Sequence, residues 1–184
     1  MRKVVFGINM TADGYCSHED GIADDQLHKY FSDLLKESDT ILFGRKTYEL
    51  MVPFWPDIAK SQSASDSINE FARVFDSLQI LLFSRTLRSA AEKTRIASGN
   101  LEQEVRALKE LPGKNITVGS LSLASQLFDL KLIDEYHLVI HPVIAGSGPK
   151  LFESQGLNEK LHLKRIHSTS FDSGATATKF TVST

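Results

Sequence analysis

The segment from Thr40 to Glu49, with the sequence T-I-L-F-G-R-K-T-Y-E, constrains the fold of this chain most strongly. Residues 40–43 are typical of a short buried strand, Gly44 interrupts the apolar run, and residues 45–51 have the pattern of a helix. A strand that passes through a glycine into a helix leaves the first helical N–H groups unpaired, at the positive end of the helix dipole. Such a corner suits a phosphate or pyrophosphate, although an ordinary strand-to-helix corner with solvated cations has the same pattern.

Strand and helix patterns alternate through the rest of the chain. Apolar and β-branched runs predict strands at residues 3–10, 40–43, 78–83, 115–118, 135–143, 160–171 and 176–182. Apolar residues at helical spacing predict helices at residues 26–36, 45–51 and 121–130, one from Asn100 to Pro112, and one that begins with a capping box of Ser67 and Glu70.

These elements and the length of 184 residues predict one domain over residues 1–184. Alternating strands and helices indicate an α/β fold with a mainly parallel central sheet flanked by helices. The last two strands are separated by Asp172-Ser173-Gly174, which is a hairpin signal, so we expect a C-terminal antiparallel hairpin.

Three polar or glycine-containing loops interrupt the pattern, at residues 11–24, 53–65 and 145–149. Long loops in compact domains often carry functional residues. Phe54 and Trp55 in the second loop either line a substrate cleft or fasten the loop to the core. Cys16 in the first loop is a possible reactive thiol, but its neighbours in sequence do not mark it as activated.

Composition excludes several classes of protein. The net charge of −2 argues against general nucleic-acid binding, and no apolar run is long enough to span a bilayer. The single cysteine rules out an internal disulfide and multi-cysteine zinc sites. His137 and His141 lie in a predicted strand, about 13 Å apart at 3.3 Å per residue, so we expect no shared metal ion. The N-terminus has no signal-peptide pattern, and we therefore expect a cytoplasmic protein.

Five motifs occur in a fixed order over nearly the whole chain: T-A-D-G at 11–14, L-F-G-R-K-T-Y-E at 42–49, F-S-R at 83–85, V-G-S at 118–120 and H-P-V-I-A-G-S-G-P-K-L-F at 141–152. With them the sequence resembles the C-terminal reductase domain of bifunctional riboflavin-biosynthesis deaminase/reductases, and the stand-alone bacterial proteins built from that domain. The resemblance implies a dihydrofolate reductase-like fold, a homodimer and NADPH as cofactor. It also implies hydride transfer to a pyrimidine- or pterin-like substrate, as in 5-amino-6-(5-phosphoribosylamino)uracil reductase activity of riboflavin biosynthesis. The deaminase half of those enzymes needs a zinc signature that this chain lacks.

The resemblance also assigns cofactor contacts. It places the pyrophosphate on Gly44, Arg45, Lys46 and Thr47. It places the 2′-phosphate and adenine on Arg45, Ser84 and Arg85. A second glycine turn near the cofactor phosphates maps onto Gly119, Ser120 and Leu121, and Gly146 maps near the nicotinamide. The family usually has two or three glycines at the second turn, whereas Ser120 carries a Cβ that keeps the cofactor farther from the backbone and a hydroxyl that can cap the helix.

The proton donor is less clearly marked. Asp13 matches the family's aspartate in the loop after the first strand, and Asp25 lies near the carboxylate that dihydrofolate reductases carry in their first helix. The spacing from Asp25 to Gly44 differs from theirs, which disfavours folate as the substrate. Asp24 and His28 are further candidates. The alternative is structural, with Asp13 as a turn residue and Asp24 or Asp25 as a helix cap.

Three functions remain open at this point. The first is an NADPH-dependent reductase that acts on a small-molecule substrate. The second is a module that binds NADP without turnover, which the serine at position 120 and the missing deaminase half favour. The third is a homodimeric interaction protein that keeps the fold and pairs subunits through the hairpin of residues 160–182.

Overall fold

The computed structural model of the protein describes residues 1–152 and 160–183. The strands are β1 (Val4–Thr11), β2 (Ser38–Gly44), β3 (Gln79–Phe83), β4 (Thr94–Ile96), β5 (Asn115–Val118), β6 (Glu135–His141), β7 (Leu163–Ser170) and β8 (Thr176–Val182). The helices are α1 (Asp25–Lys36), α2 (Arg45–Met51), α3 (Trp55–Ser61), α4 (Asp66–Asp76), α5 (Leu101–Glu110) and α6 (Leu121–Asp129). None of these helices is long and apolar enough to cross a membrane.

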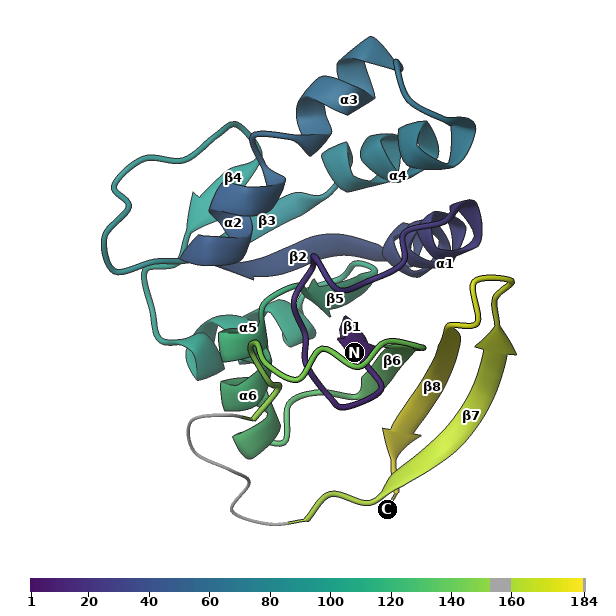
Figure 1. Cartoon of the computed structure of the whole chain (residues 1–184). Coiled ribbons are helices and arrows are strands. Elements are labelled where there is room, and N and C mark those ends of the chain that lie inside the picture. Colours follow the sequence, from purple (N-terminus) through teal and green to yellow (C-terminus); the bar gives the residue numbers. More distant parts are fainter. Residues whose placement is uncertain (153–159, 184) are drawn as a thin grey trace.

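The strands form one eight-stranded sheet in the order β4-β3-β2-β5-β1-β6-β8-β7 (Figure 1). The strands β1 to β6 pair in parallel, and β8 runs antiparallel to both β6 and β7. The prediction of a mainly parallel sheet with a C-terminal antiparallel hairpin is confirmed. The strand β1 lies between β5 and β6, as its continuous apolar sequence predicts for a doubly covered strand.

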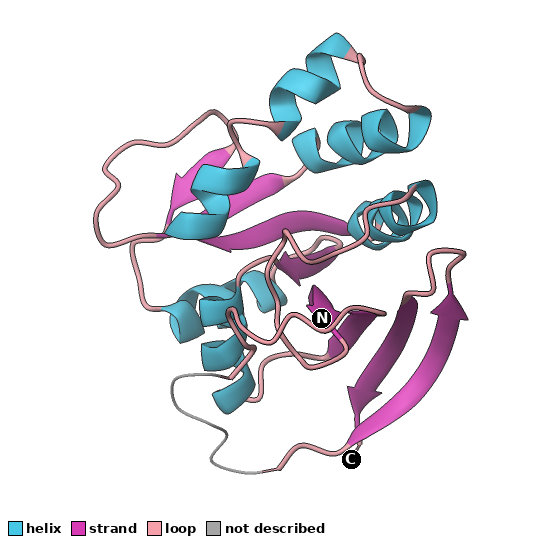
Figure 2. Cartoon of the chain, in the orientation of Figure 1, coloured by secondary structure: helices cyan, strands magenta, loops and turns pink. Residues whose placement is uncertain are grey.

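Helices cover both faces of this sheet (Figure 2). Side chains alternate between the two faces along a strand, so one strand serves two cores. Leu42 packs with the core under α5 and α6, whereas Ile41 and Phe43 pack with the core under α1 and α4. The two hydrophobic cores therefore meet at β2, the strand that leads into the glycine corner.

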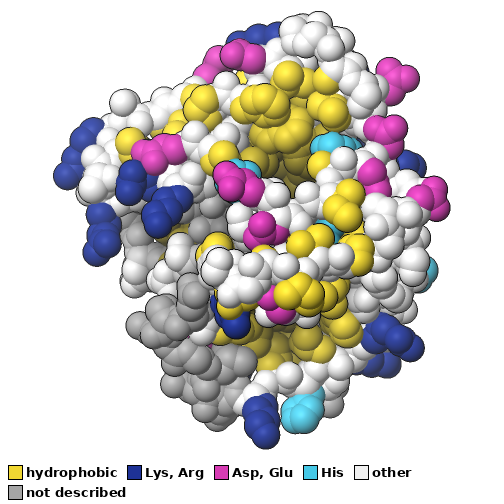
Figure 3. All heavy atoms as spheres, viewed as in Figure 1, with side chains coloured by type: hydrophobic (Ala, Val, Ile, Leu, Met, Phe, Trp, Pro, Cys, Tyr) yellow, Lys and Arg dark blue, Asp and Glu magenta, His cyan; other side chains and the backbone are white. Residues whose placement is uncertain are grey.

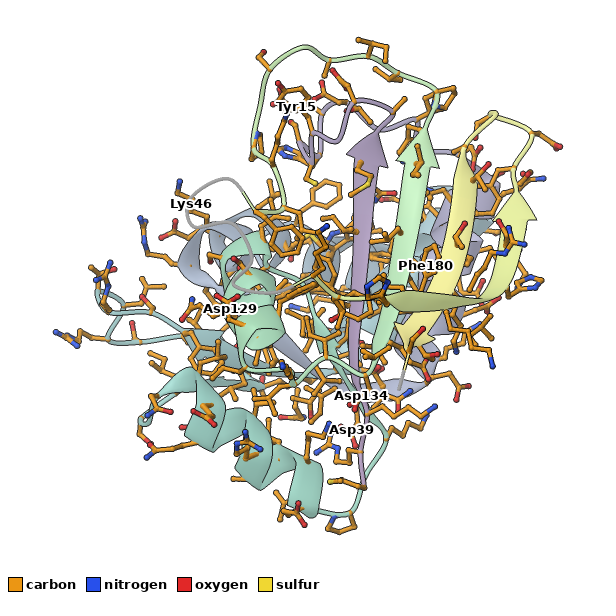
Figure 4. The ribbon with its side chains drawn as sticks, turned by 90° about the horizontal axis from the view of Figure 1, so that it is seen from below. Tyr15, Asp39, Lys46, Asp129, Asp134 and Phe180 are labelled. Carbon is orange, nitrogen blue, oxygen red and sulfur yellow. The ribbon has the colours of Figure 1, made fainter. Side chains whose placement is uncertain are left out.

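Parallel strands end at the same edge of a sheet, and here that edge collects the loops after β1, β2, β3, β5 and β6. Figure 4 shows Tyr15 and Lys46 at this end of the molecule and Asp39 and Asp134 at the other. Ligands of open α/β sheets bind outside the carboxyl ends of the strands. This edge is therefore where a site is expected.

Two expectations for residues 53–67 are wrong. The predicted polar loop contains the helix α3, which begins at Trp55 with Pro56 in its first turn, a position where proline is favoured. The helix α4 begins at Asp66 with Ser65 at its N-cap, so Ser67 and Glu70 do not form a capping box. Their side chains bind α1 instead, through Asp25 and Lys36 respectively, because α1 packs against α4.

Two smaller differences concern strands. The three-residue strand β4, which pairs with β3 at the sheet edge, lies in a polar segment with too few apolar residues to show a period. The seventh strand begins at Leu163, three residues later than predicted, and a bulge between Arg165 and His167 interrupts its pairing with β8.

Gly119 occupies a position where the fold leaves no room for a side chain. Its N–H donates to the carbonyl oxygen of Leu42 (3.0 Å), and a Cβ at this position would overlap the ring of Phe43. Phe43 is fully buried and stacks on Phe75, so it cannot move aside without disturbing the core.

We therefore expect Gly119→Ala to lower the free energy of unfolding by about 1–3 kcal/mol, the usual effect of overpacking. Urea denaturation monitored by circular dichroism measures this change. Gly99→Ala is the matched control, because a Cβ there meets its neighbours at ordinary contact distances of 3.5 Å or more. Equal stability of the two variants would show that the Phe43 ring yields.

Candidate functional site

Two glycine corners lie side by side at the carboxyl edge of the sheet. Gly44 is the N-cap of α2 after β2, and Ser120 is the N-cap of α6 after the neighbouring strand β5. A Cβ at position 44 would lie 2.9 Å from Oγ of Ser120, so the two corners touch. The unpaired N–H groups that begin α2 and α6 therefore share one region of positive potential.

Ser120 occupies the N-cap position of α6, but its side chain does not cap the helix as predicted. Its side chain makes no capping hydrogen bond, and its Oγ lies 3.2 Å from Oγ of Ser122. Ser120 is buried against the Gly44 corner. The hydroxyl therefore lies between the two helix starts, where the family's extra glycine would leave open space.

Cationic side chains surround these corners. Arg45 and Lys46 are exposed at the start of α2, and Arg85 is exposed just after β3, which is the other neighbour of β2. Because Gly44 pairs in register with Phe83, the chain leaves the sheet at Ser84 beside the start of α2. Figure 3 shows Lys and Arg side chains gathered on this side, over α2 and the loop after β3.

Two side chains of this group, those of Arg45 and Ser84, make hydrogen bonds within the protein. The Arg45 guanidinium pairs with Glu49 one turn along α2, at 3.0 and 3.2 Å. The Ser84 hydroxyl accepts hydrogen bonds from the backbone N–H groups of Thr86 (3.3 Å) and Leu87 (3.0 Å), and thereby fixes the turn after β3. The predicted phosphate ligands Gly44, Arg45, Lys46, Ser84 and Arg85 thus lie at one edge of the sheet, at the ends of two adjacent strands.

The loops after β1 and β6 are joined to each other. Tyr15 forms an antiparallel bridge with Lys150 and receives its ammonium group over the ring, 4.5 Å from the centroid. The N–H of Cys16 donates to the carbonyl of Pro149 (2.7 Å). Cys16 is buried, and burial raises the pKa of its thiol to about 11, so it is not an activated nucleophile.

Asp13 provides the strongest link between these loops. Its carboxylate accepts hydrogen bonds from the Thr11 hydroxyl (2.6 Å) and from the backbone N–H groups of Ala145 (3.2 Å) and Gly146 (2.8 Å). The bonds from Thr11 and Gly146 lower the pKa of the Asp13 carboxyl to about 2. At neutral pH this group is ionised and holds no proton to donate, which is the chemistry of a loop anchor.

His141 holds the far part of the first loop. Its Nδ1 accepts the backbone N–H of Ile22 (3.1 Å), so Nε2 carries the proton and donates to Oδ1 of Asn9 (3.0 Å). His141 is fully buried, and burial lowers its pKa. His137 lies on the same face of β6 but contacts the Tyr30 hydroxyl through Nδ1 (2.7 Å), so the two histidines have separate partners.

The start of α1 contains the other proton-donor candidates. Asp24 is the N-cap and accepts the N–H of Leu27 (2.7 Å), which is the capping alternative named above. The carboxylate of Asp25 accepts a hydrogen bond from Ser67 on α4. His28 bonds the carbonyl oxygen of Asp24 through Nδ1 (2.9 Å), and its ring lies edge-on to Phe71.

An apolar hollow lies between α1, α3 and α4, and is visible in Figure 3 as a recess with hydrophobic walls. Phe54 and Trp55 meet edge to face, with ring centroids 5.1 Å apart, and Trp55 packs on Phe71 at 4.5 Å. Trp55 therefore fastens the 53–65 segment to the core, while Phe54 stays 54% exposed. Phe71 was outside the sequence-based site, because its helical spacing marks it only as a core residue.

Comparison with known proteins gives a family match over nearly the whole chain and a relative of similar length. The family model described as RibD C-terminal domain matches residues 2–177. Protein YyaP of Bacillus subtilis (strain 168), whose own description is uncharacterized, is 31% identical over 179 residues, which are 94% of this chain and 91% of YyaP.

Solved structures share the fold. RibD of Acinetobacter baumannii superimposes with a TM-score of 0.73 at 12% identity, over 100% of this chain and 59% of that one. Dihydrofolate reductase from Enterococcus faecalis, in complex with NADP(H) and RAB-propyl, gives a TM-score of 0.63 at 10% identity, over 98% and 96% of the two chains. The prediction of a dihydrofolate reductase-like fold is confirmed.

The buried histidines predict how stability depends on pH. Burial lowers the pKa of His137 to about 4 and also lowers that of His141, whereas an unfolded chain binds these protons near pH 6.5. The unfolded state therefore binds more protons between these values, and the free energy of unfolding should fall by about 1–3 kcal/mol as the pH drops from 6.5 to 4.5. Urea denaturation at a series of pH values measures it.

Two variants test the assignment. His137→Gln keeps a hydrogen-bonding side chain and should flatten this part of the profile. His167→Gln removes an exposed imidazole of β7 and should leave the profile unchanged. If both variants follow the wild-type profile, the imidazole of His137 is not a source of the pH dependence.

Proposed function

We propose that this chain, which belongs to the RibD C-terminal domain family, is a reductase that uses NADPH to reduce a small heterocyclic substrate of the pyrimidine or pterin type. The observation that carries the proposal is the contact between the two glycine corners at Gly44 and Ser120, flanked by Arg45 and Arg85. The corners offer N–H groups for a pyrophosphate, and the arginines offer charge for a 2′-phosphate. We further propose one domain over residues 1–184, located in the cytoplasm.

The residues present fit such a cofactor. A Cβ at position 44 would lie 2.9 Å from Oγ of Ser120, so glycine at this position lets the two helix starts approach each other closely. The Ser120 Cβ takes up part of the cradle. Among the residues that the structure describes, its hydroxyl bonds that of Ser122, and it can turn toward a phosphate oxygen. The Arg45 guanidinium has to exchange Glu49 for the phosphate, and both side chains are half exposed, so the exchange costs little.

NADPH supplies the hydride when bound, and the protein's part in such a reaction is to orient the reactants and exclude water. The paired loops after β1 and β6 are placed to do this, because they border the carboxyl ends of the two central strands. Asp13 holds Ala145 and Gly146 in place through their N–H groups, and Gly146 is the residue that the family resemblance places near the nicotinamide. In this proposal Asp13 contributes order rather than a proton.

The arrangement of carboxylates favours one alternative, a module that binds NADP without turnover. Asp13 is ionised in the loop contact, Asp24 caps α1, and Asp25 bonds Ser67, so each predicted carboxyl donor has another task. Oxidation of NADPH by the protein in the presence of pterin and pyrimidine substrates, followed at 340 nm, separates a reductase from a binding module.

We also propose that the protein forms a homodimer. Ile140 pairs with Thr176 in register and therefore shares a sheet face with Phe180 and Val182, two and three alternations farther along β8. Ile140 and Val182 are exposed on this face, which gives it an apolar character that a second copy would cover.

Ile140→Asp should therefore convert a dimer into a monomer, because a carboxylate would be buried without a partner at the interface. Sedimentation velocity at micromolar concentration measures the change. The control is Leu111→Asp, at an exposed apolar position just after α5. A monomeric wild-type protein would contradict the proposal.

For the cofactor site, Arg45→Ala should weaken NADPH binding by about 1–3 kcal/mol, or roughly 5- to 150-fold, because a charge-assisted bond to phosphate is lost. Binding is followed through the fluorescence of Trp55, the single tryptophan. Arg73→Ala on α4, whose guanidinium bonds Gln62, is the control and should bind as the wild type does.

NADH lacks the 2′-phosphate and should bind the wild type more weakly than NADPH. Its binding should also respond less to Arg45→Ala than NADPH binding does, because NADH lacks one of the two phosphate groups assigned to Arg45. Equal affinity of the wild type for NADPH and NADH would contradict the 2′-phosphate site at Arg45, Ser84 and Arg85.

A further inference from the structure

The apolar hollow has a wall of four rings in a continuous chain. Phe54 meets Trp55, Trp55 meets Phe71, and Phe71 meets His28, with centroid separations of 5.1, 4.5 and 6.2 Å. We call these four residues the aromatic wall. It runs from α3 across α4 to α1, so three helices fix its shape.

The aromatic wall is anchored in the core at one end and open at the other. Phe71 is buried and stacks on Phe75, with an interplanar angle of 19° and centroids 6.4 Å apart. Phe54 exposes 54% of its surface although it lies against Trp55. A ring held by its neighbours yet open to solvent offers contact area at a low entropic cost, which suits stacking with a planar ligand.

The hollow is close to the proposed cofactor corner. The helix α2 begins at Arg45, directly after the Gly44 corner, and is followed within a few residues by Phe54. One short helix of about 10 Å, at 1.5 Å per residue, therefore connects the phosphate corner with the aromatic wall.

His28 gives the wall one directional polar group. Its Nδ1 is within 2.9 Å of the Asp24 carbonyl oxygen, which can only accept, so Nδ1 carries a proton. In the neutral ring Nε2 is then an acceptor, and no hydrogen bond joins it to residues 1–152 or 160–183. An acceptor on an apolar wall selects ligands that present an N–H group.

The first turns of the three helices around the hollow are acidic. The first turns of α1, α3 and α4 carry Asp25, Asp57 and Asp66, and Ser67 bonds Asp25, so the starts of α1 and α4 lie together. In Figure 3 acidic side chains lie on several sides of the hollow, and the densest group of Lys and Arg side chains lies away from it on the left, over α2. A phosphate is normally held by cations, and carboxylates repel it.

We infer that the aromatic wall binds a planar, uncharged heterocycle that carries a ring N–H and no phosphate group. The ring stacks on Phe54 and its N–H donates to Nε2 of His28. This inference rests on the proposed function, because it names the substrate class of the same reductase. It separates this chain from reductases whose substrate carries a phosphoribosyl group.

Riboflavin and flavin mononucleotide are a matched pair of probes, because they share the isoalloxazine ring with its N3–H and differ by one phosphate. Calorimetric titration of the full chain should show riboflavin binding at least tenfold more tightly than flavin mononucleotide. Equal or tighter binding of flavin mononucleotide, or no binding of riboflavin, would overturn the inference.

Variants locate the ligand on the wall. Phe54→Ala should weaken riboflavin binding about tenfold, as expected for one stacked ring, and Phe54 is exposed enough for the variant to fold. His28→Phe keeps a ring and removes the acceptor, and should lower affinity for riboflavin but not for 3-methylriboflavin, which has no N3–H. Leu111→Ala, a distant exposed apolar residue, is the control and should bind as the wild type. Unchanged binding in Phe54→Ala and His28→Phe would place the ligand elsewhere.

The outcome is separable from the cofactor proposal. Riboflavin is titrated with and without NADPH, and NADPH binding is measured on the same variants. Riboflavin binding without NADPH binding would support the aromatic wall and reject the reductase. NADPH binding to a protein that prefers flavin mononucleotide would support the cofactor site and reject the inference.

Discussion

The close approach of β5 to β2 at the carboxyl edge is the constraint on which this site depends. Gly119 lies against the ring of Phe43, and the next two backbone positions, Gly44 and Ser120, touch in turn. A side chain at position 119 would push the strands apart and separate the starts of α2 and α6. The contact of Gly119 with Phe43 completes the packing of the core, and it also brings the N–H groups at the starts of α2 and α6 together. Stability and phosphate binding therefore share one steric requirement.

Electrostatics divides the edge into two regions. Arg45, Lys46 and Arg85 make the region around the glycine corners positive, whereas Asp25 and Asp66 make the hollow beside α1 and α4 negative. Charge therefore favours a ligand with phosphates at the glycine corners and disfavours it in the hollow, whereas a neutral planar ligand carries no net charge that would keep it out of the hollow. The division arises because α4 and α1 begin with carboxylates, as the helix dipole favours, while α2 begins with two cations against that preference.

Much of the fold follows from local pattern, because strands with continuous apolar sequence and helices with an apolar face are readable over short windows. The corner at Gly44 and the cap at Asp24 were readable in the same way. The role of Asp13 was not, because its partners Ala145 and Gly146 are far away in the chain and are recognised only through their backbone N–H groups. The contact between His28 and Phe71 in the aromatic wall likewise depends on the packing of α1 against α4. No spacing of residues in a single sequence indicates which helices will pack together.

The link between the loops after β1 and β6 has a consequence for how a ligand enters. Asp13 and the pairing of Tyr15 with Lys150 join two segments that are more than 130 residues apart into one body. Neither loop can swing out alone without breaking charge-assisted hydrogen bonds. The two loops must therefore move as one unit. The rate at which this unit opens sets a common upper limit on the exchange of any ligand that lies beneath it.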